Sequence, residues 1–388
     1  MDGLLTDYYF LKSFYCMGKE HDVCYDCAYC RARDKHNDKE YFTPPSDINP
    51  LFTKIPVVIN VFYGDPLMYL LDTIKCLSIL KEAKHQGPVI IITKGDMSEK
   101  KVKETFDRDW GLKIYFGLSV FGNDEFDNVG TLDRLRTNLH VCQELSKKYT
   151  YSYGIEYRPI INGINDSDVL MRQIFLLATY YGTGIAYSGL QVEPELADYI
   201  KEKNLPFTPY EGYEFGMKKN ISNEVIDKLK YYSSIYRVPI FKKTSCSISY
   251  FLNIGRDYNS HYYRPNEMGC VDCPNNSNCS SFKMFADDLI VWANDDEKLK
   301  QLPFDLEFVH KDKHECRLHR RGLCKFPSDD CMNISGTLLT TDRKLTTSDV
   351  RVIKWLTGFT VDAEFVESPY ISEDWLVNNN SNKEESND

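Results

Sequence analysis

Three cysteines near the start of the chain could bind one metal centre together. Cys24, Cys27 and Cys30 are each separated by two residues, a spacing that lets one loop turn several thiolates toward a single point. In a reducing compartment, thiolates gathered in this way usually hold a metal rather than a disulfide. Three ligands suit a four-iron cluster with one open iron, because a structural zinc site is normally closed by four. A zinc knuckle is the alternative interpretation of the same residues.

A second group of cysteines lies in the C-terminal half of the chain. Cys270, Cys273 and Cys279 form a Cys-x2-Cys-x5-Cys pattern, and Cys246 upstream brings the number of thiolates to four. Four ligands would close the site, so this group would hold structure or conduct electrons, as an iron–sulfur cluster or as a zinc site. His261 lies within this segment and could replace Cys246.

A third group mixes histidines and cysteines with basic residues. Histidine and cysteine together suit zinc rather than an iron–sulfur cluster, and the basic residues could form a local phosphate-binding face. A solvated basic loop with incidental cysteines is the alternative. The group comprises His314, Cys316, His319, Cys324 and Cys331, with Lys311, Lys313, Arg317, Arg320, Arg321 and Lys325 between them.

The overall composition limits the classes of protein to which the chain can belong. Its 388 residues allow one large domain and a smaller one, and its net charge of -10 argues against broad, nonspecific adhesion to nucleic acid or to an anionic membrane. Thirteen cysteines, an odd and clustered number, fit intracellular metal sites better than a disulfide framework. No apolar run is long enough to span a membrane, and no signal peptide is evident, so we expect a soluble cytoplasmic protein.

Strands and helices that would position these residues alternate along the first half of the chain. We expect strands over residues 8–16, 56–62, 89–93, 113–120, 151–161 and 184–188, with helices over 67–84, 98–108, 132–147 and 169–180. This alternation predicts an α/β fold with a parallel sheet, either open or partly closed as a barrel. Sites in such folds lie at the carboxyl ends of the strands, where the sequence has Gly64, Asp65, Ser119 and Arg158.

Shifts in composition indicate three parts of the chain. Residues 1–243 contain the alternating strands and helices, and residues 244–377 are rich in cysteines and in loop-forming residues. Residues 378–388 are polar and charged, which is typical of a disordered tail. We therefore predict an α/β domain, a cysteine-rich C-terminal domain and a tail.

Several short motifs, taken in order, resemble those of one enzyme family. Cys27-Ala28-Tyr29-Cys30 is similar to the end of the Cys-x3-Cys-x-aromatic-Cys loop of radical S-adenosylmethionine enzymes. Tyr63-Gly64-Asp65-Pro66 resembles the Gly-Gly-Glu-Pro motif that follows the second strand in that family. The later strand ends, Thr93-Lys94-Gly95 and Arg158 to Asp166, are most similar in wording to the branch that contains the spore photoproduct lyases, which repair DNA. The resemblance covers residues 8 to 190 and implies a partial (β/α)6 TIM-like barrel.

The resemblance also implies a reaction and a set of cofactor-binding residues. Cys24, Cys27 and Cys30 would hold a [4Fe-4S] cluster whose open iron binds S-adenosylmethionine, and reduction would release a 5'-deoxyadenosyl radical. The other cofactor-binding residues would be Tyr29 at the adenine, Tyr63 and Gly64 in the strand-end motif, Asp65 at the methionine ammonium, Ser119 at the ribose and Arg158 at the methionine carboxylate.

The first cysteine spacing departs from the family pattern. The family places three residues between its first two cysteines, whereas Cys24 and Cys27 have two between them, and Val23 occupies the usual ligand position. Cys16 is the alternative first ligand. We favour Cys24, because the shorter loop closes at a lower entropic cost.

The sequence does not decide between two classes of substrate. The likeness to photoproduct lyases indicates nucleic acid, whereas the C-terminal cysteines resemble the auxiliary-cluster domains of the family and indicate a peptide or small molecule. A low-potential electron donor is implied in either case. The hypothesis from another class is a noncatalytic zinc-binding interaction module in which every cysteine group is structural.

Overall fold

The computed structural model describes residues 11–12, 40–41, 56–59, 65–190, 194–202, 204, 206, 221–253, 274, 307–310, 337–340 and 360–361. Four candidate site residues fall within these ranges, namely Asp65, Ser119, Arg158 and Cys246. The others lie outside the described residues, as do the mixed histidine and cysteine group and the expected tail. These other candidates are Cys24, Cys27, Tyr29, Cys30, Tyr63, Gly64, Cys270, Cys273 and Cys279.

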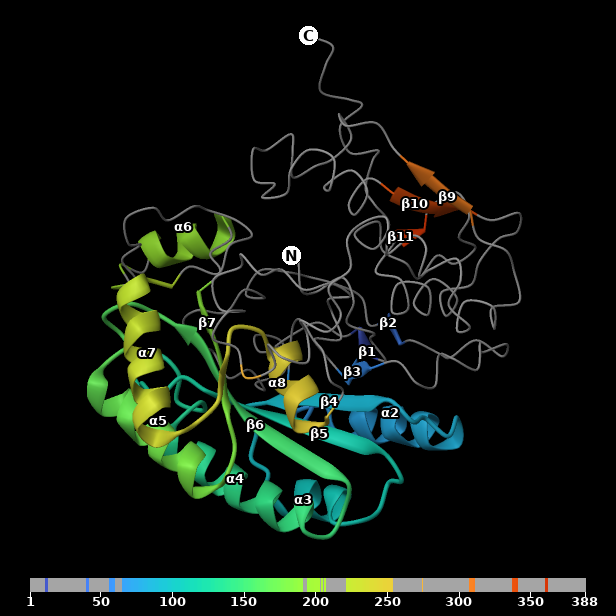
Figure 1. Ribbon diagram of the computed structural model, residues 1–388. Helices are drawn as coiled ribbons and strands as arrows, with labels where there is room; N and C mark the ends of the chain where they lie inside the picture. The colour runs from blue at the N-terminus through green and yellow to red at the C-terminus, as the bar shows by residue number, and fades with distance from the viewer. Residues whose placement is uncertain are drawn as a thin grey trace.

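Six parallel strands form the central sheet, and they follow one another across it in the order of the sequence (Figure 1). Because crossovers between parallel strands share one hand, a sequential order places the connecting helices on one face, as in a barrel. The expected α/β fold of the partial-barrel kind is therefore confirmed. The strands are β3 (Val57–Ile59), β4 (Pro88–Thr93), β5 (Lys113–Val120), β6 (Tyr151–Ile160), β7 (Ile185–Gly189) and β8 (Ile240–Phe241).

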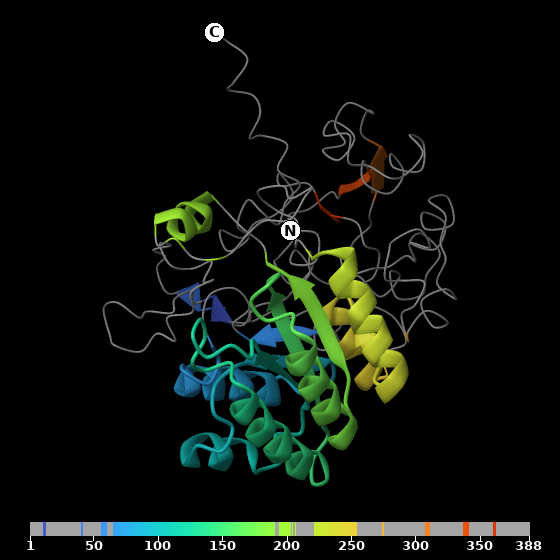
Figure 2. The same cartoon turned by 90° about the vertical axis from the view of Figure 1, so that its left-hand side faces the viewer.

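Five of the described helices cover the outer face of this sheet (Figures 1 and 2). Three of them begin after Thr131, Ser167 or Ser222, whose side-chain oxygen accepts a hydrogen bond from the backbone N–H three residues further on. The helices are α2 (Leu70–Glu82), α3 (Lys100–Phe106), α4 (Leu132–Ser146), α5 (Asp168–Tyr180) and α7 (Asn223–Tyr236), and α6 (Pro194–Glu202) lies between α5 and α7 in the sequence.

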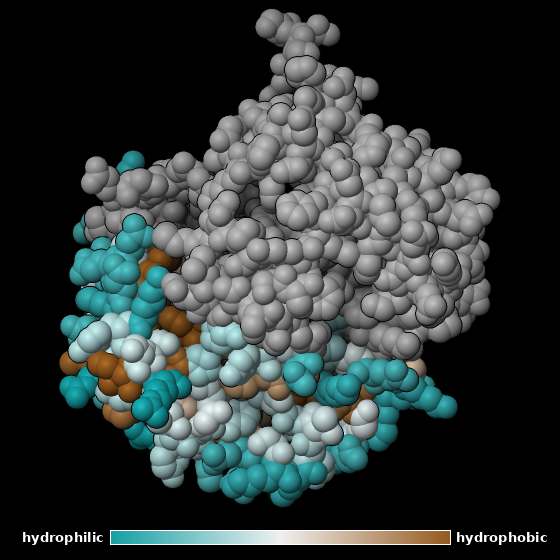
Figure 3. Space-filling model, viewed as in Figure 1, coloured by the Kyte–Doolittle hydropathy of each residue, from teal (hydrophilic) through white to brown (hydrophobic). Residues whose placement is uncertain are grey.

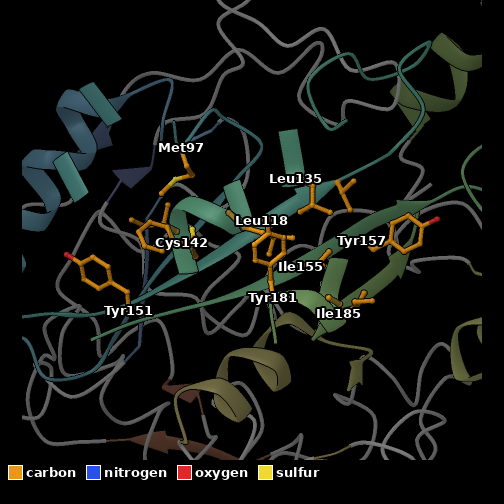
Figure 4. Packing of buried hydrophobic residues seen from close by; sticks show 14 of the residues in the cluster. Met97, Leu118, Leu135, Cys142, Tyr151, Ile155, Tyr157, Tyr181 and Ile185 are labelled. Atoms are coloured by element: carbon orange, nitrogen blue, oxygen red, sulfur yellow. The ribbon is translucent and has the colours of Figure 1, made fainter. Parts of the chain in front are cut away.

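Alternate strand residues fill the core between the sheet and these helices. Leu118, Ile155 and Ile185 come from neighbouring strands and pack in one cluster with residues of the covering helices (Figure 4). Cys142 of α4 is buried in this cluster, and burial raises the pKa of its thiol. Cys76 of α2 is buried in the same core, so both thiols pack as small apolar groups.

Among the described helices, α8 (Thr244–Phe251) is the one that covers the inner face of the sheet (Figure 1). Its Ile248 packs against Val58, Ile90 and Tyr115, which point away from the outer core. This helix follows the domain boundary that we expected at residue 243, and it packs directly on the α/β sheet.

One member of the sheet differs from the expected set of strands. Within the expected first strand, over residues 8–16, the described part is β1 (Leu11–Lys12), which pairs antiparallel with β2 (Glu40–Tyr41) in a separate sheet. The sixth parallel strand is β8, whose two residues are too few to produce a periodic pattern.

A third sheet consists of β9 (Glu307–His310), β10 (Thr337–Thr340) and β11 (Thr360–Val361).

Gly154 lies under the contact between the sheet and α8, and we expect Gly154→Ala to destabilise the protein. A Cβ at this position would collide with the Tyr115 hydroxyl, which hydrogen-bonds to Ser247 of α8 at 3.1 Å. The expected loss is about 1–3 kcal/mol in the free energy of unfolding, measured by urea denaturation. In the Tyr115→Phe background the same substitution should be less destabilising, because the colliding oxygen is gone. An equal loss in both backgrounds would contradict this explanation.

Apolar side chains are exposed on two neighbouring helices, α5 and α7. Each of the five side chains is more than half exposed, and those of α5 recur at the seven- and four-residue intervals that mark one helix face. Figure 3 shows brown areas over this part of the surface. The residues are Val169, Leu176, Tyr180, Tyr231 and Ile235. Within the described residues, no helix combines the length and the apolar character that crossing a membrane needs.

Candidate functional site

Three of the predicted cofactor-binding residues lie at the carboxyl edge of the sheet. Asp65 contacts the end of β4, Ser119 is the penultimate residue of β5, and Arg158 lies near the end of β6. Ser119 pairs in register with Glu156, so the two residues share the inner face, and the Arg158 guanidinium reaches Glu156 on that face. Ser119 and Arg158 thus bring a hydroxyl and a guanidinium to neighbouring strand ends.

Asp65 uses both carboxylate oxygens to fasten the segment after β3 to the end of β4. Its Oδ1 accepts hydrogen bonds from the Leu67 N–H at 2.9 Å and from the Thr93 hydroxyl at 2.5 Å. Its Oδ2 accepts from the Lys94 N–H at 2.6 Å and from the Gly95 N–H at 3.2 Å. Burial raises the pKa of the Asp65 carboxyl, and these four hydrogen bonds act in the opposite direction.

A buried ion pair joins the end of β4 to the loop after β5. Lys94 Nζ lies 2.7 Å from Asp127 Oδ2, and the Asp127 side chain is completely buried. Asp127 Oδ1 also accepts hydrogen bonds from the backbone of Val129 and Gly130. The carbonyl of Gly130 in turn accepts from Phe121 and Gly122, directly after β5. The pair therefore shapes the loop that borders Ser119.

Lys94→Met is expected to destabilise the protein by about 3–5 kcal/mol, because it leaves the Asp127 carboxylate buried without its cation. Urea denaturation measures the effect. Lys148→Met is the matched control, since Lys148 and Asp107 form an ion pair of similar length at the exposed surface, and no measurable change is expected there. Equal effects of the two substitutions would show that burial does not increase the contribution of the Lys94–Asp127 pair to the free energy of unfolding.

Asn165 connects the ends of β5 and β6 from within. Its side-chain amide donates to the carbonyls of Phe121 and Pro159, at 3.0 and 2.9 Å, and its Oδ1 accepts from the Ile161 N–H at 2.7 Å. The Tyr157 hydroxyl donates to the Asn165 carbonyl. Three buried side chains, Asp65, Asp127 and Asn165, thus hold the carboxyl edge in one arrangement.

Arg158 is paired with a carboxylate that the sequence analysis did not identify. Its Nε lies 2.9 Å from Glu156 Oε2, the Glu156 side chain is fully buried, and the Arg158 side chain is 24% exposed. At this point β6 has one residue more than the facing part of β7, a bulge of the kind that redirects side chains at barrel rims. The Arg158 side chain therefore meets the buried Glu156 carboxylate and is itself partly exposed at the carboxyl edge of the sheet.

Cys246, a predicted metal ligand, lies in α8 and is buried against Ala186 and Phe241 on the inner face of the sheet. Among the described residues, no three histidine, cysteine or acidic side chains gather closely enough to hold a metal. The cysteines predicted to share a site with Cys246 all lie outside the described residues. Its role as a ligand stays a prediction.

Sequence reasoning missed Glu156, Asp127 and Asn165 as site residues. Glu156 carried a usable signal, because it alternates with Gly154 and Arg158 along a strand and places a charge on a face that should be buried. Asp127 and Asn165 lie in loops. Only their tertiary contacts distinguish them from ordinary turn residues.

The fold and this edge define a class of protein, namely a partial α/β barrel with polar groups at the carboxyl ends of its strands. Among solved structures, a radical SAM methyltransferase from Sphaerobacter thermophilus matches with a TM-score of 0.34 and 16% identity, over 48% of this chain and 49% of that chain. Streptococcus suis SuiB bound to S-adenosylmethionine matches with a TM-score of 0.34 and 14% identity, over 61% of this chain and 48% of that chain.

The chain spans about half the length of both solved structures, and a likeness of this size carries no conclusion about its activity. No family model matches the chain, and no curated protein matches its sequence. Arguments about function therefore depend on the residues themselves.

Proposed function

We propose that the chain is a radical S-adenosylmethionine enzyme. In this proposal Cys24, Cys27 and Cys30 hold a [4Fe-4S] cluster, and S-adenosylmethionine binds at the neighbouring carboxyl edge of the sheet. When bound, the reduced cluster supplies the electron that cleaves the sulfonium and yields a 5'-deoxyadenosyl radical. We further propose a cytoplasmic location, where thiolates stay reduced.

The observation that carries the proposal is the juxtaposition of Ser119 and Arg158. They come from neighbouring parallel strands, and both reach the inner face at the carboxyl edge, where partial barrels bind their ligands. A hydroxyl and a guanidinium suit the ribose and the carboxylate of S-adenosylmethionine. The order of these residues along the chain was already expected from the family motifs.

The available donors fit the cofactors by their chemistry. Three thiolates in a short loop suit an iron–sulfur cluster that leaves one iron for a ligand. In the described residues, Glu156 contacts the Nε edge of Arg158, and no other acceptor there meets the guanidinium, so its two terminal nitrogens suit a bidentate carboxylate. Tyr29, Tyr63 and Gly64 keep their proposed places around the adenine and the strand-end motif.

For Asp65 we propose a positioning role in place of direct contact with the methionine ammonium. A carboxylate offers about four lone-pair sites, and the four donors at Asp65 fill them. Asp65 then acts by holding the segment after β3 beside the end of β4. Asp65, the third residue of the Tyr63-Gly64-Asp65-Pro66 motif, therefore supports the site structurally.

Anaerobic purification followed by iron, sulfide and zinc analysis tests the proposal. We expect about four irons and four sulfides per chain from one cluster, and about eight of each if the cysteine group around Cys270 holds a second. Reduction in the presence of S-adenosylmethionine should yield 5'-deoxyadenosine. Zinc without iron or sulfide, and no cleavage, would overturn the proposal and favour the noncatalytic zinc-binding module.

The substrate is proposed at the level of two classes. Nucleic acid follows from the wording shared with photoproduct lyases and from the basic residues around Arg320 and Arg321, whereas a peptide or small molecule follows from the auxiliary-type cysteines. A salt-dependent mobility shift of DNA or RNA that Arg320→Ala/Arg321→Ala abolishes would favour nucleic acid. Absence of any shift at low salt would favour the second class.

A further inference from the structure

The pair of Glu156 and Arg158 is an unusual feature for the inner face of a sheet. Glu156 is fully buried and Arg158 is three-quarters buried. Burying an ion pair requires the desolvation of both charges, and well-packed apolar residues would often serve stability equally well. The pair therefore calls for an explanation other than stability of the fold.

Glu156 is held from both sides through a single oxygen. Its Oε2 forms an ion pair with Arg158, whose Nε lies 2.9 Å away, and accepts a hydrogen bond from the Thr244 hydroxyl at 2.9 Å. Thr244 is the first residue of α8, so the carboxylate lies between the sheet and the helix that covers it. Both contacts meet at the same oxygen, so the carboxylate holds Arg158 close to the start of α8.

Gly117 on the neighbouring strand leaves the space that Glu156 occupies. A Cβ at Gly117 would lie 3.1 Å from Glu156 Cγ and 3.2 Å from Ile92 Cγ1, closer than such contacts normally are. A side chain there would therefore press on the carboxylate. The absence of a side chain at Gly117 in β5 therefore leaves room for the Glu156 side chain.

The contact with Glu156 is made at the Nε edge of the Arg158 guanidinium. A guanidinium has five N–H donors in a planar fork, and four of them lie on the two terminal nitrogens rather than on Nε. The fork formed by the terminal nitrogens matches the two oxygens of a carboxylate. An arginine whose direction is fixed in advance loses less rotamer entropy when it binds that group.

We propose that Glu156 is a positioning residue that, together with Thr244 of α8, orients Arg158 for a ligand carboxylate. This inference rests on the proposed function, in which that carboxylate belongs to S-adenosylmethionine. Glu156 itself does not touch the ligand. Helix α8 thereby becomes part of the binding site through one hydroxyl.

The test compares two ligands that differ in the carboxylate alone. The full-length, cluster-loaded chain is titrated anaerobically and without reductant, by calorimetry, with S-adenosylmethionine and with its decarboxylated form. We expect the wild type to prefer S-adenosylmethionine by roughly 10- to 100-fold, the range of a charge-assisted hydrogen bond. Glu156→Gln should reduce this preference by roughly tenfold and leave the affinity for the decarboxylated ligand nearly unchanged.

Arg158→Ala separates positioning from a general structural role. In the Arg158→Ala background the preference should be smaller than in the wild type, and adding Glu156→Gln should change neither affinity further, because the two residues act through one contact. If Glu156→Gln weakens both ligands equally, or if its effect persists without Arg158, Glu156 is merely structural and the inference is wrong.

Thr244→Val keeps the inference testable if Glu156→Gln does not fold. It removes one donor to Glu156 while keeping the shape of the side chain, and we expect the preference to fall by roughly threefold. Ser247→Ala is the matched control, since its hydroxyl lies one turn along α8 and contacts Tyr115 instead. An unchanged preference in Thr244→Val, or an equal fall in Ser247→Ala, would overturn the inference.

Failure of the proposed function gives a different result. In that case the wild type itself contains no iron and binds neither ligand, and the positioning role fails with it. Failure of the positioning role alone leaves wild-type binding intact and appears only in the variants.

Discussion

Replacing Cys30 with alanine is expected to abolish the iron–sulfur centre and, with it, cleavage of S-adenosylmethionine. The proposed site has only three thiolates, so the loss of one leaves two, too few to hold a four-iron cluster. Iron and sulfide per chain should each fall by about four relative to the wild type after anaerobic reconstitution. The yield of 5'-deoxyadenosine should fall below detection.

Cys142→Ala provides the matched control for this experiment. Cys142 is also a cysteine, but it is buried in the outer core and its thiol has a raised pKa, so it is unsuited to ligation. Its replacement should leave iron and sulfide unchanged. An iron content of Cys30→Ala equal to that of the wild type, or an equal loss from both variants, would show that Cys30 does not bind the cluster.

Asp65→Ala is expected to destabilise the fold by about 3–5 kcal/mol, an effect as large as that expected for Lys94→Met at the same edge. The substitution removes the acceptor of four buried donors, which are three backbone N–H groups and the Thr93 hydroxyl. Water that enters the space would satisfy some of these groups, which limits the loss. The free energy of unfolding by urea measures the effect.

Asp107→Ala is the comparison for Asp65→Ala, because Asp107 also accepts side-chain hydrogen bonds but lies at the surface, with Lys148 and Tyr149. No measurable change in stability is expected for it. If Asp65→Ala is also neutral, Asp65 does not hold the edge together. Its assignment as a positioning residue would then be withdrawn in favour of direct ligand contact.

The alternation of strands and helices was predictable because the apolar periodicity was strong. The helices expected over 132–147 and 169–180 agree with α4 and α5 to within one residue at each end, and the strand over 113–120 agrees with β5. The membership of the sheet was predicted less well. Two residues, Ile240 and Phe241, complete it as β8, and such a short segment shows no period of its own.

The role of α8 could not be predicted from its sequence. Its residues, Thr244 to Phe251, include four serine and threonine side chains, which read as a surface or loop segment. In the fold three of its serines are buried, and Thr244 and Ser247 meet Glu156 and Tyr115 on the sheet. Buried polar side chains are tolerated when they have hydrogen-bond partners. The partners of Thr244 and Ser247 come from distant parts of the chain.

By itself the sequence determined the α/β class, the order of the strand-end residues and the spacing of the thiolates, because period, order and spacing are properties of neighbouring residues. Only the tertiary structure decided that Asp65 is saturated by protein donors, that Arg158 is paired with Glu156, and that α8 completes their surroundings. Each of these facts is a contact between segments far apart in the chain. Such contacts depend on strand register and on the packing of a helix against the sheet, which no local pattern specifies.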